Sequence, residues 1–522
     1  MTNLGSRRRF LRNAALWAGT ALAALKTGTR VAVAAPVFIN DPFQLGVASG
    51  DPSADGFVLW TRLAPDLFDP QALPQEAIPV AWEIASDRAM KKIVAHGQVL
   101  AHPEFAHSVH VDVTGLMPGR EYFYRFHAGA AVSRVGRALT WPTPRGPADR
   151  VRFAVASCQA YDEGYFSAYR DMVAQDPAFI LHLGDYIYET TRIPPVRRVP
   201  VADAYTLEEY RLLHAIYKTD PDLQAAHAHC PWLYMWDDHE VANDYARDQS
   251  ERTQDPAVFV KRRIAAYQAV YEHMPLRISA RADASGRSYM FQRSDYGDLA
   301  AFTLLDLRQF RDRVACQTET DHSGRVADTT VCTEITNPKR TVLGDTQERW
   351  FGSNFVKNPA AWNVIAQTLM LSEFDQTTNG GYAVFTDSWG GYPAARRKII
   401  NLVRDRKVPN CISLGGDIHS YFVSDIRDND KDERSPILMS EFVGTSITSE
   451  STNYALYTSF LPRNPQIKFF DDRKRGYMLC DVDRTVWKTA LRTVDDVRVR
   501  EGRFATLRSF AVENGKSGVQ AT

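Results

Sequence analysis

Short runs in which apolar and polar residues alternate fill the chain from about residue 40 to residue 143. Turn-forming residues separate the clearest of these runs, which span residues 56–62, 80–85, 108–113 and 121–126. A period of two residues is typical of strands with one buried face, and this region lacks the 3.6-residue period of a helix. The pattern predicts a small all-β domain, an immunoglobulin- or fibronectin-like β-sandwich.

The pattern changes after residue 150. Mainly apolar runs, such as residues 151–157 and 179–184, now alternate with stretches of helical period at 163–175, 206–217 and 259–272. Such runs are typical of strands buried on both faces, and their alternation with helices predicts an α/β domain. We place this domain at residues 150–502, after a proline-rich linker, and expect a polar C-terminal tail over residues 503–522.

The first 34 residues have the features of an export signal. Consecutive arginines at 7–9 precede Phe10 and Leu11, a moderately apolar stretch follows at 14–25, and small residues occupy 32–34. This arrangement is typical of a twin-arginine signal peptide. The apolar stretch is shorter than the ~20 residues that span a bilayer. We expect a periplasmic or secreted protein that engages the twin-arginine translocation machinery and has no stable membrane span.

Charge and cysteine content narrow the classes further. The 522 residues include 62 Lys and Arg and 62 Asp and Glu, so the basic excess typical of nucleic-acid binders is absent. We therefore expect no nucleic-acid-binding domain. In an exported chain Cys316 and Cys332 are a plausible disulfide pair. Cys158 follows an apolar run among polar residues and is better interpreted as a thiolate, whereas Cys411 and Cys480 lie in apolar runs and are expected to be buried.

Four apolar runs end in side chains that bind metal ions. In chain order these side chains are Cys158; Asp185 and Tyr188; Asp237, Asp238 and His239; and Asp417 and His419. Ligands gathered from the ends of distant strands are how an α/β sheet assembles a metal site. Each motif alone has an ordinary alternative, such as an aspartate that caps a turn or a helix. The recurrence favours a metal centre, because the alternative requires four independent coincidences.

The residue types indicate a division of roles. Asp185 can bridge two cations through its two oxygens, and Tyr188 as a phenolate suits a hard trivalent ion such as Fe³⁺ more than Zn²⁺. Asp238 would bind the second cation. His239 would protonate or stabilise a departing oxygen.

Together these motifs resemble those of the PhoD-like alkaline phosphatases, within the calcineurin-like metallophosphatase superfamily. The similarity covers nearly all of the chain after the signal, at residues 49–52, 59–62, 157–159, 184–189, 236–243, 305–308 and 415–419. It implies an α/β fold with a metallophosphatase β-sandwich core flanked by helices, preceded by the small all-β domain. It also implies an exported phosphoesterase that hydrolyses phosphate esters with a metal-activated water.

The resemblance also implies a ligand set. Fe³⁺ would be held by Cys158, Asp185, Tyr188 and His419, and Ca²⁺ by Asp185, Asp238 and Asp417, with Asn243 serving a further calcium. Oxygen ligands at the second metal fit the preference of calcium for hard donors. Arg192 is a candidate for phosphate binding, whereas Arg308 is as easily a structural residue. His182 is expected to be a core histidine.

Two alternatives stay open. The same site would attack diesters, as a phosphodiesterase or phospholipase D-like hydrolase, if the cleft admits a second ester group. The chain would otherwise be an inactive wall-polymer-binding protein that uses its β-sandwich. The intact set Cys158, Asp185, Asp238 and His419 argues against this last alternative.

Overall fold

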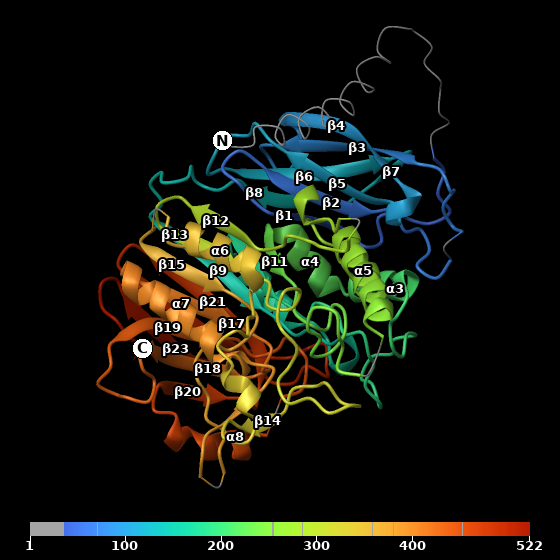
Figure 1. Cartoon of the computed structure of the whole chain (residues 1–522). Coiled ribbons are helices and arrows are strands. Elements are labelled where there is room, and N and C mark those ends of the chain that lie inside the picture. The colour runs from blue at the N-terminus through green and yellow to red at the C-terminus, as the bar shows by residue number, and fades with distance from the viewer. Residues whose placement is uncertain are drawn as a thin grey trace, which may run out of the picture. The chain divides into compact units, whose positions relative to one another are not determined.

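The computed structural model describes residues 36–522 except 70, 253–254, 284, 358, 379 and 452 (Figure 1). The predicted signal peptide, residues 1–34, lies outside the described residues. Phe38–Thr522 forms one compact unit. Among the described residues, none of the helices has the length and apolar character needed to cross a membrane.

The larger sheet joins both ends of the chain. Its ten strands lie in the order β24 (Gln520–Ala521), β23 (Phe504–Glu513), β22 (Val486–Val494), β21 (Arg475–Asp483), β9 (Arg150–Ala156), β10 (Phe179–Leu183), β11 (Trp232–Met235), β1 (Val47–Gly50), β2 (Phe57–Arg62) and β5 (Ser108–Val113). At its centre β9, β10 and β11 run parallel, with Ile180 opposite both Ala154 and Trp232. The carboxyl ends of these three strands therefore meet at one edge.

A second sheet also has a parallel centre. Its seven strands lie in the order β12 (Gln292–Tyr296), β13 (Ala300–Leu304), β15 (Trp362–Ala366), β17 (Cys411–Gly415), β19 (Ile437–Val443), β18 (Tyr421–Arg427) and β20 (Ile467–Asp471). The pairs from β13 to β19 are parallel. All five residues of β13, β15 and β17 are buried, as the apolar runs predict.

Aromatic side chains pack the two sheets face to face. The ring of Phe302 in the second sheet lies 5.2 Å from that of Phe153 and 5.3 Å from that of Phe179, both in the first sheet. Trp362 and Trp487 make a similar contact at 5.8 Å. This shared core confirms the predicted β-sandwich.

Helices flank the sandwich. Residues of α2 (Ala168–Ala174), α3 (Leu207–Tyr217), α4 (Pro221–His229) and α5 (Pro256–His273) join the main core, whereas α6 (Gly344–Asn354) and α7 (Pro393–Arg406) pack on the second sheet. In Figure 1, α3, α4 and α5 lie on the right of the view and α7 lies on the left. Within the part of the chain that the structure describes, the remaining α-helix is α8 (Tyr454–Phe460). The predicted helical stretches thus correspond to α2, α3 and α5.

The N-terminal region is all-β, as predicted. A separate sheet contains β4 (Ile93–Ala101), β3 (Ile78–Ala85), β6 (Glu121–Ala128) and β7 (Ala131–Val132), with β8 (Gly136–Leu139) beside β6. It packs on β1, β2 and β5 through a common apolar core. Because β1 also pairs with β11, the β-rich region shares a continuous sheet with the α/β region. Local pattern cannot reveal such a long-range pairing.

The segment after Gly502 corrects one prediction. Residues 503–522 were expected to form a polar tail, but β23 pairs with β22 along its whole length and β24 pairs with β23. Only Phe510, Ala511 and Val512 of β23 are buried. The other seven residues are exposed or partly exposed near a sheet edge, so the segment lacks the apolar run of a fully buried strand.

A long polar region lies beyond β13. Between residues 312 and 340 the elements are β14 (Val326–Asp328), which pairs with β16 (Ala383–Phe385), and one turn of 3₁₀ helix at Thr333–Thr336. The Cys316–Cys332 disulfide is present, as predicted. Cys411 and Cys480 are buried and free, also as predicted.

Candidate metal centre

Strand ends from both sheets deliver the predicted ligands to one place. Cys158 follows β9, Asp185 follows β10, and Asp238 follows β11, all at the same edge of the larger sheet. Asp417 and His419 follow β17 of the second sheet. Because the two sheets pack face to face, residues far apart in the sequence become neighbours.

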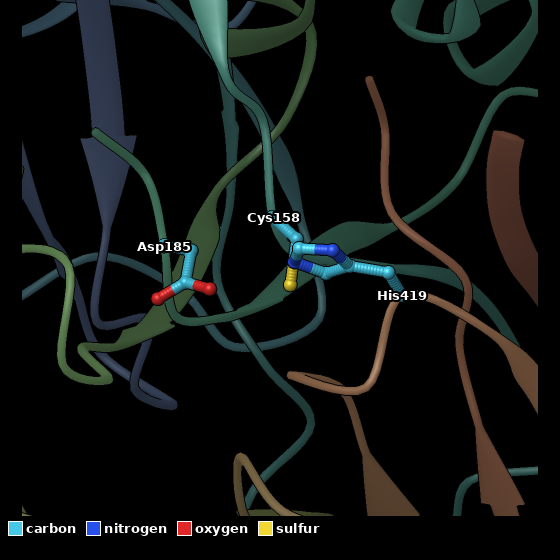
Figure 2. A group of neighbouring side chains, drawn as sticks. All are labelled: Cys158, Asp185 and His419. Atoms are coloured by element: carbon cyan, nitrogen blue, oxygen red, sulfur yellow. The ribbon is translucent and has the colours of Figure 1, made fainter. Parts of the chain in front are cut away.

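The first group of side chains contains Cys158, Asp185 and His419. One donor atom from each lies within 4.8 Å of the other two, and Figure 2 shows the three on separate segments. The Tyr188 hydroxyl joins them, 3.0 Å from His419 Nε2 and 3.2 Å from Asp185 Oδ2. The four residues predicted to hold the first cation therefore meet.

The ring of His419 is oriented for binding through Nε2. Its Nδ1 lies 2.6 Å from the backbone oxygen of Glu450. A carbonyl oxygen accepts only, so Nδ1 carries the hydrogen and Nε2 keeps its lone pair toward the first group. Burial lowers the pKa of His419 to about 4, which keeps the imidazole neutral.

Two further groups of possible ligands overlap the first. They are Asp185 with Asp238 and His239, and Asp237 with Asp238 and Asp417. Asp185 and Asp238 thus link all three groups into one array. Within the described residues, Asp185 Oδ1 and Asp238 Oδ1 are buried and make no hydrogen bond. A buried carboxylate oxygen without a hydrogen bond is costly, and a cation would satisfy both atoms; Asp238 Oδ1 has only a 3.4 Å ion pair with Arg308.

The backbone at this centre adopts conformations that most residues avoid. Cys158, Asp185, Asp417 and His419 have φ values of 58°, 55°, 65° and 54°, in the left-handed region. Such values carry a conformational cost and cluster at functional sites. Gly184 is also at positive φ, and a Cβ there would clash with the turn after β11. The close approach of the two turns requires glycine at this position.

Electrostatics at the centre favours bound cations. Burial raises the pKa of the Cys158 thiol and of the Tyr188 hydroxyl well above their ordinary values, and Asp185 raises both further. Burial and the nearby Asp238 raise the pKa of Asp185 as well. Without bound metal these three groups would therefore keep their protons. Bound cations would favour their deprotonated forms.

His239 is held as a charged donor. Its Nδ1 lies 2.7 Å from Glu189 Oε2, and its ring stacks on Tyr188 with centroids 4.1 Å apart. Burial opposes the charge, but Glu189, Asp238 and Asp185 together raise the pKa of His239 well above its usual value. Because Glu189 occupies Nδ1, the proton on Nε2 is the one available for transfer.

Asn243 and Arg192 lie beside the three groups, not in them. Asn243 donates its side-chain amide to Glu251 at 2.6 Å and its backbone N–H to Glu189 at 2.7 Å. Arg192 forms ion pairs with Glu450 at 2.6 Å and with Glu163 at 3.5 Å. The guanidinium of Arg192 is half exposed and adjoins the loop whose carbonyl orients His419.

The sequence did not reveal the residues that position the ligands. The Glu240 carboxylate accepts backbone N–H groups of Asp185, Tyr186 and Asp237, which ties together the turns after β10 and β11. Its position beside His239 was the only signal, and that was equally typical of a helix start. Nothing in the sequence marked Asp387, a buried carboxylate that accepts hydrogen bonds from Arg308 and Arg311. His182 is fully buried without hydrogen bonds among aromatic rings, which confirms it as a core histidine.

Comparison with known proteins decides the family. The sequence-family model of the PhoD-like phosphatase matches residues 153–491. The family model of the N-terminal domain of PhoD-like phosphatases matches residues 29–142. The chain belongs to the PhoD-like phosphatase family. It is therefore a phosphoric ester hydrolase, and the metallophosphatase-like fold predicted from the motifs is confirmed.

Two relatives cover almost the whole chain. Alkaline phosphatase D of Bacillus subtilis (strain 168) is 41% identical over 530 residues, which cover 99% of this chain and 89% of the relative. A solved structure described as that of PhoD is 40% identical, covers 93% of each chain and superposes with a TM-score of 0.89. The likeness includes both the β-rich N-terminal region and the α/β region.

Proposed function

We propose that this phosphoesterase is an exported alkaline phosphatase that depends on Fe³⁺ and Ca²⁺. The first group would hold Fe³⁺ through Cys158, Asp185, Tyr188 and His419, and Ca²⁺ would bind Asp185, Asp238 and Asp417. The observation that carries this proposal is the single array of donors linked by Asp185 and Asp238, each with one buried oxygen that makes no hydrogen bond.

The chemistry of the donors supports the two assignments. Thiolate, phenolate and neutral imidazole suit a transition-metal ion, and an all-carboxylate set suits Ca²⁺. Asn243 is the candidate for a further Ca²⁺. The side-chain amide nitrogen of Asn243 donates a hydrogen bond to Glu251, so its Oδ1 would be the atom that binds Ca²⁺. When bound, the cations supply Lewis-acid stabilisation of the phosphate ester and activation of water.

The side chains around the donors would complete the reaction. His239 would give its Nε2 proton to the departing alkoxide oxygen, and Glu189 would hold the ring in place for that transfer. Arg192 would attract the phosphate at the rim, in competition with Glu450. Asp185 would act by bridging the cations. No serine or threonine nucleophile is needed in this scheme.

Export is proposed from the first 34 residues. The arginines at 7–9, the apolar stretch at 14–25 and the small residues at 32–34 support recognition by the twin-arginine machinery. This route carries folded proteins, so the metal centre would be assembled before transport. The triple variant Arg7→Lys, Arg8→Lys and Arg9→Lys should leave the protein in the cytoplasm, which cell fractionation would detect.

Metal analysis combined with ester assays tests the proposed chemistry. We expect iron and calcium in the purified protein, a visible absorption band from Tyr188 or Cys158 to iron, and loss of activity after chelation. A colourless, fully active protein with zinc alone would overturn the assignment of iron. Aryl phosphate monoesters and diesters assayed side by side would decide between phosphomonoesterase and phosphodiesterase activity.

A further inference from the structure

A fully buried arginine lies against the carboxylates of the second cation site. Arg308, shortly after β13, has no exposed surface. Its Nε donates to Asp237 Oδ1 at 2.5 Å, and its Nη1 donates to Asp387 Oδ2 at 2.6 Å. Its Nη2 lies 3.2 Å from Asp417 Oδ1 and 3.4 Å from Asp238 Oδ1. One guanidinium thus contacts four aspartates.

Arg308 cannot bind the substrate directly. Its side chain is buried, and its three nitrogens are all engaged by carboxylates. The sequence left Arg308 open between phosphate binding and a structural role, and the burial removes phosphate binding. Any effect on the reaction must therefore act through the neighbouring aspartates.

The contacts of Arg308 divide into two kinds. Asp237 and Asp387 are close partners that are themselves held, since Thr368 donates to Asp237 at 2.8 Å and Arg311 donates to Asp387 Oδ1 at 2.7 Å. These partners fix the guanidinium. The contacts with Asp238 and Asp417 are longer, and these two residues are the ones proposed to bind Ca²⁺.

We propose that Arg308 is a fixed countercharge built into the second cation site. It holds Asp238 and Asp417 side by side before a divalent cation binds, and its positive charge limits how tightly that cation is held. Buried carboxylates in contact repel one another, so the metal-free site needs a positive partner. The same charge repels an incoming cation. Arg308 is a positioning residue, and this inference rests on the proposed function.

Two charge changes of opposite sign test the inference. After chelation, the melting temperature would be measured over a Ca²⁺ titration, with the Ca²⁺ Kd from calorimetry, for wild type, Arg308→Gln and Asp387→Asn. Arg308→Gln should melt at a lower temperature without Ca²⁺, show a larger Ca²⁺-dependent rise, and bind Ca²⁺ about tenfold or more tightly. Asp387→Asn leaves Arg308 less neutralised, so it should show a smaller rise and weaker binding.

Arg396→Gln is the matched control. Arg396 is also buried and pairs with two carboxylates, Asp430 and Glu373, outside the three groups. This variant should melt at a lower temperature but keep the wild-type rise with Ca²⁺. A purely structural arginine at 308 would behave in the same way.

The outcomes separate the inference from the proposed function. An unchanged or smaller Ca²⁺-dependent rise in Arg308→Gln, or a larger rise in Asp387→Asn, overturns the role of Arg308. If Arg308→Gln does not fold, the sign of the change in Asp387→Asn decides alone, and an unchanged rise there also counts against the inference. A wild-type protein without any Ca²⁺-dependent rise would overturn the calcium site and this inference together.

Discussion

The candidate metal centre has two halves, one around Cys158 and His419 and one around Asp238 and Asp417, and buried charge is balanced differently in each. The first half combines Cys158, Tyr188 and His419 with a single carboxylate, and uncharged forms of the first three are stable without metal. The second half brings several aspartates together and contains Arg308 as a fixed positive charge. The first half can balance its charge without a cation by keeping protons. In the second half burial also raises the pKa of Asp417, and Arg308 adds a permanent positive charge.

Removing the ligand shared by both halves should have the largest effect. Asp185→Asn should lower kcat/KM by about a thousandfold or more, because the bridging carboxylate serves both cations. Metal analysis should show loss of iron and weaker calcium binding. Asp481→Asn is the control, since Asp481 pairs with Arg150 and Arg152 away from the centre. Retained activity in Asp185→Asn would show that the site is misplaced.

Replacing a ligand that belongs only to the first half should show whether the two halves bind their metal ions independently. Cys158→Ser should lower activity by about a hundredfold or more and remove iron together with the visible band. The rise in melting temperature with Ca²⁺ should persist, because the carboxylate half is intact. Cys480→Ser, at a buried cysteine of β21, should change neither metal content nor the spectrum. Simultaneous loss of both metals in Cys158→Ser would contradict the division into halves.

The loss of activity on replacing His239, the proposed general acid, should depend on the leaving group of the substrate. His239→Gln should lower kcat by about 10²–10⁴-fold for alkyl phosphates, whose alkoxide needs a proton. The loss should be much smaller for a nitrophenyl phosphate, and metal content should stay at the wild-type level. His229→Gln is the control, because His229 also pairs with a carboxylate, that of Asp176, but precedes β11, at the opposite end of the strand from His239. Metal loss in His239→Gln would make His239 a ligand instead.

The smallest effect is expected at the rim beside the first half. Arg192→Gln should raise KM by up to about fivefold and leave kcat unchanged, since exposed ion pairs contribute little. Steady-state kinetics over a range of salt concentrations would measure this effect. A fall in kcat would indicate that Arg192 acts through Glu450, whose carbonyl orients His419.

Much of the fold was predictable because its strands carry local signals. The alternating runs before residue 143 and the apolar runs before Cys158 and Asp185 predicted strands at the observed positions. The β23 strand was missed because only three of its ten residues are buried, so the strand lacks a long apolar run. The pairing of β1 with β11 was also invisible, since a parallel partner distant in sequence leaves no periodic signature.

The sequence by itself determined which side chains stand at the strand ends, and the motif around each of them identified the family chemistry. Only the tertiary structure decided which residues support them. Arg308 follows β13 of one sheet and meets Asp237 and Asp238, which follow β11 of the other, only when the two sheets pack face to face. Glu240 gains its role because β10 and β11 are neighbours in one sheet, and Asp387 because it meets Arg308. The physical reason is that a ligand motif is a local arrangement of atoms, whereas charge balance in a buried site depends on whatever residues the packing brings within a few ångströms.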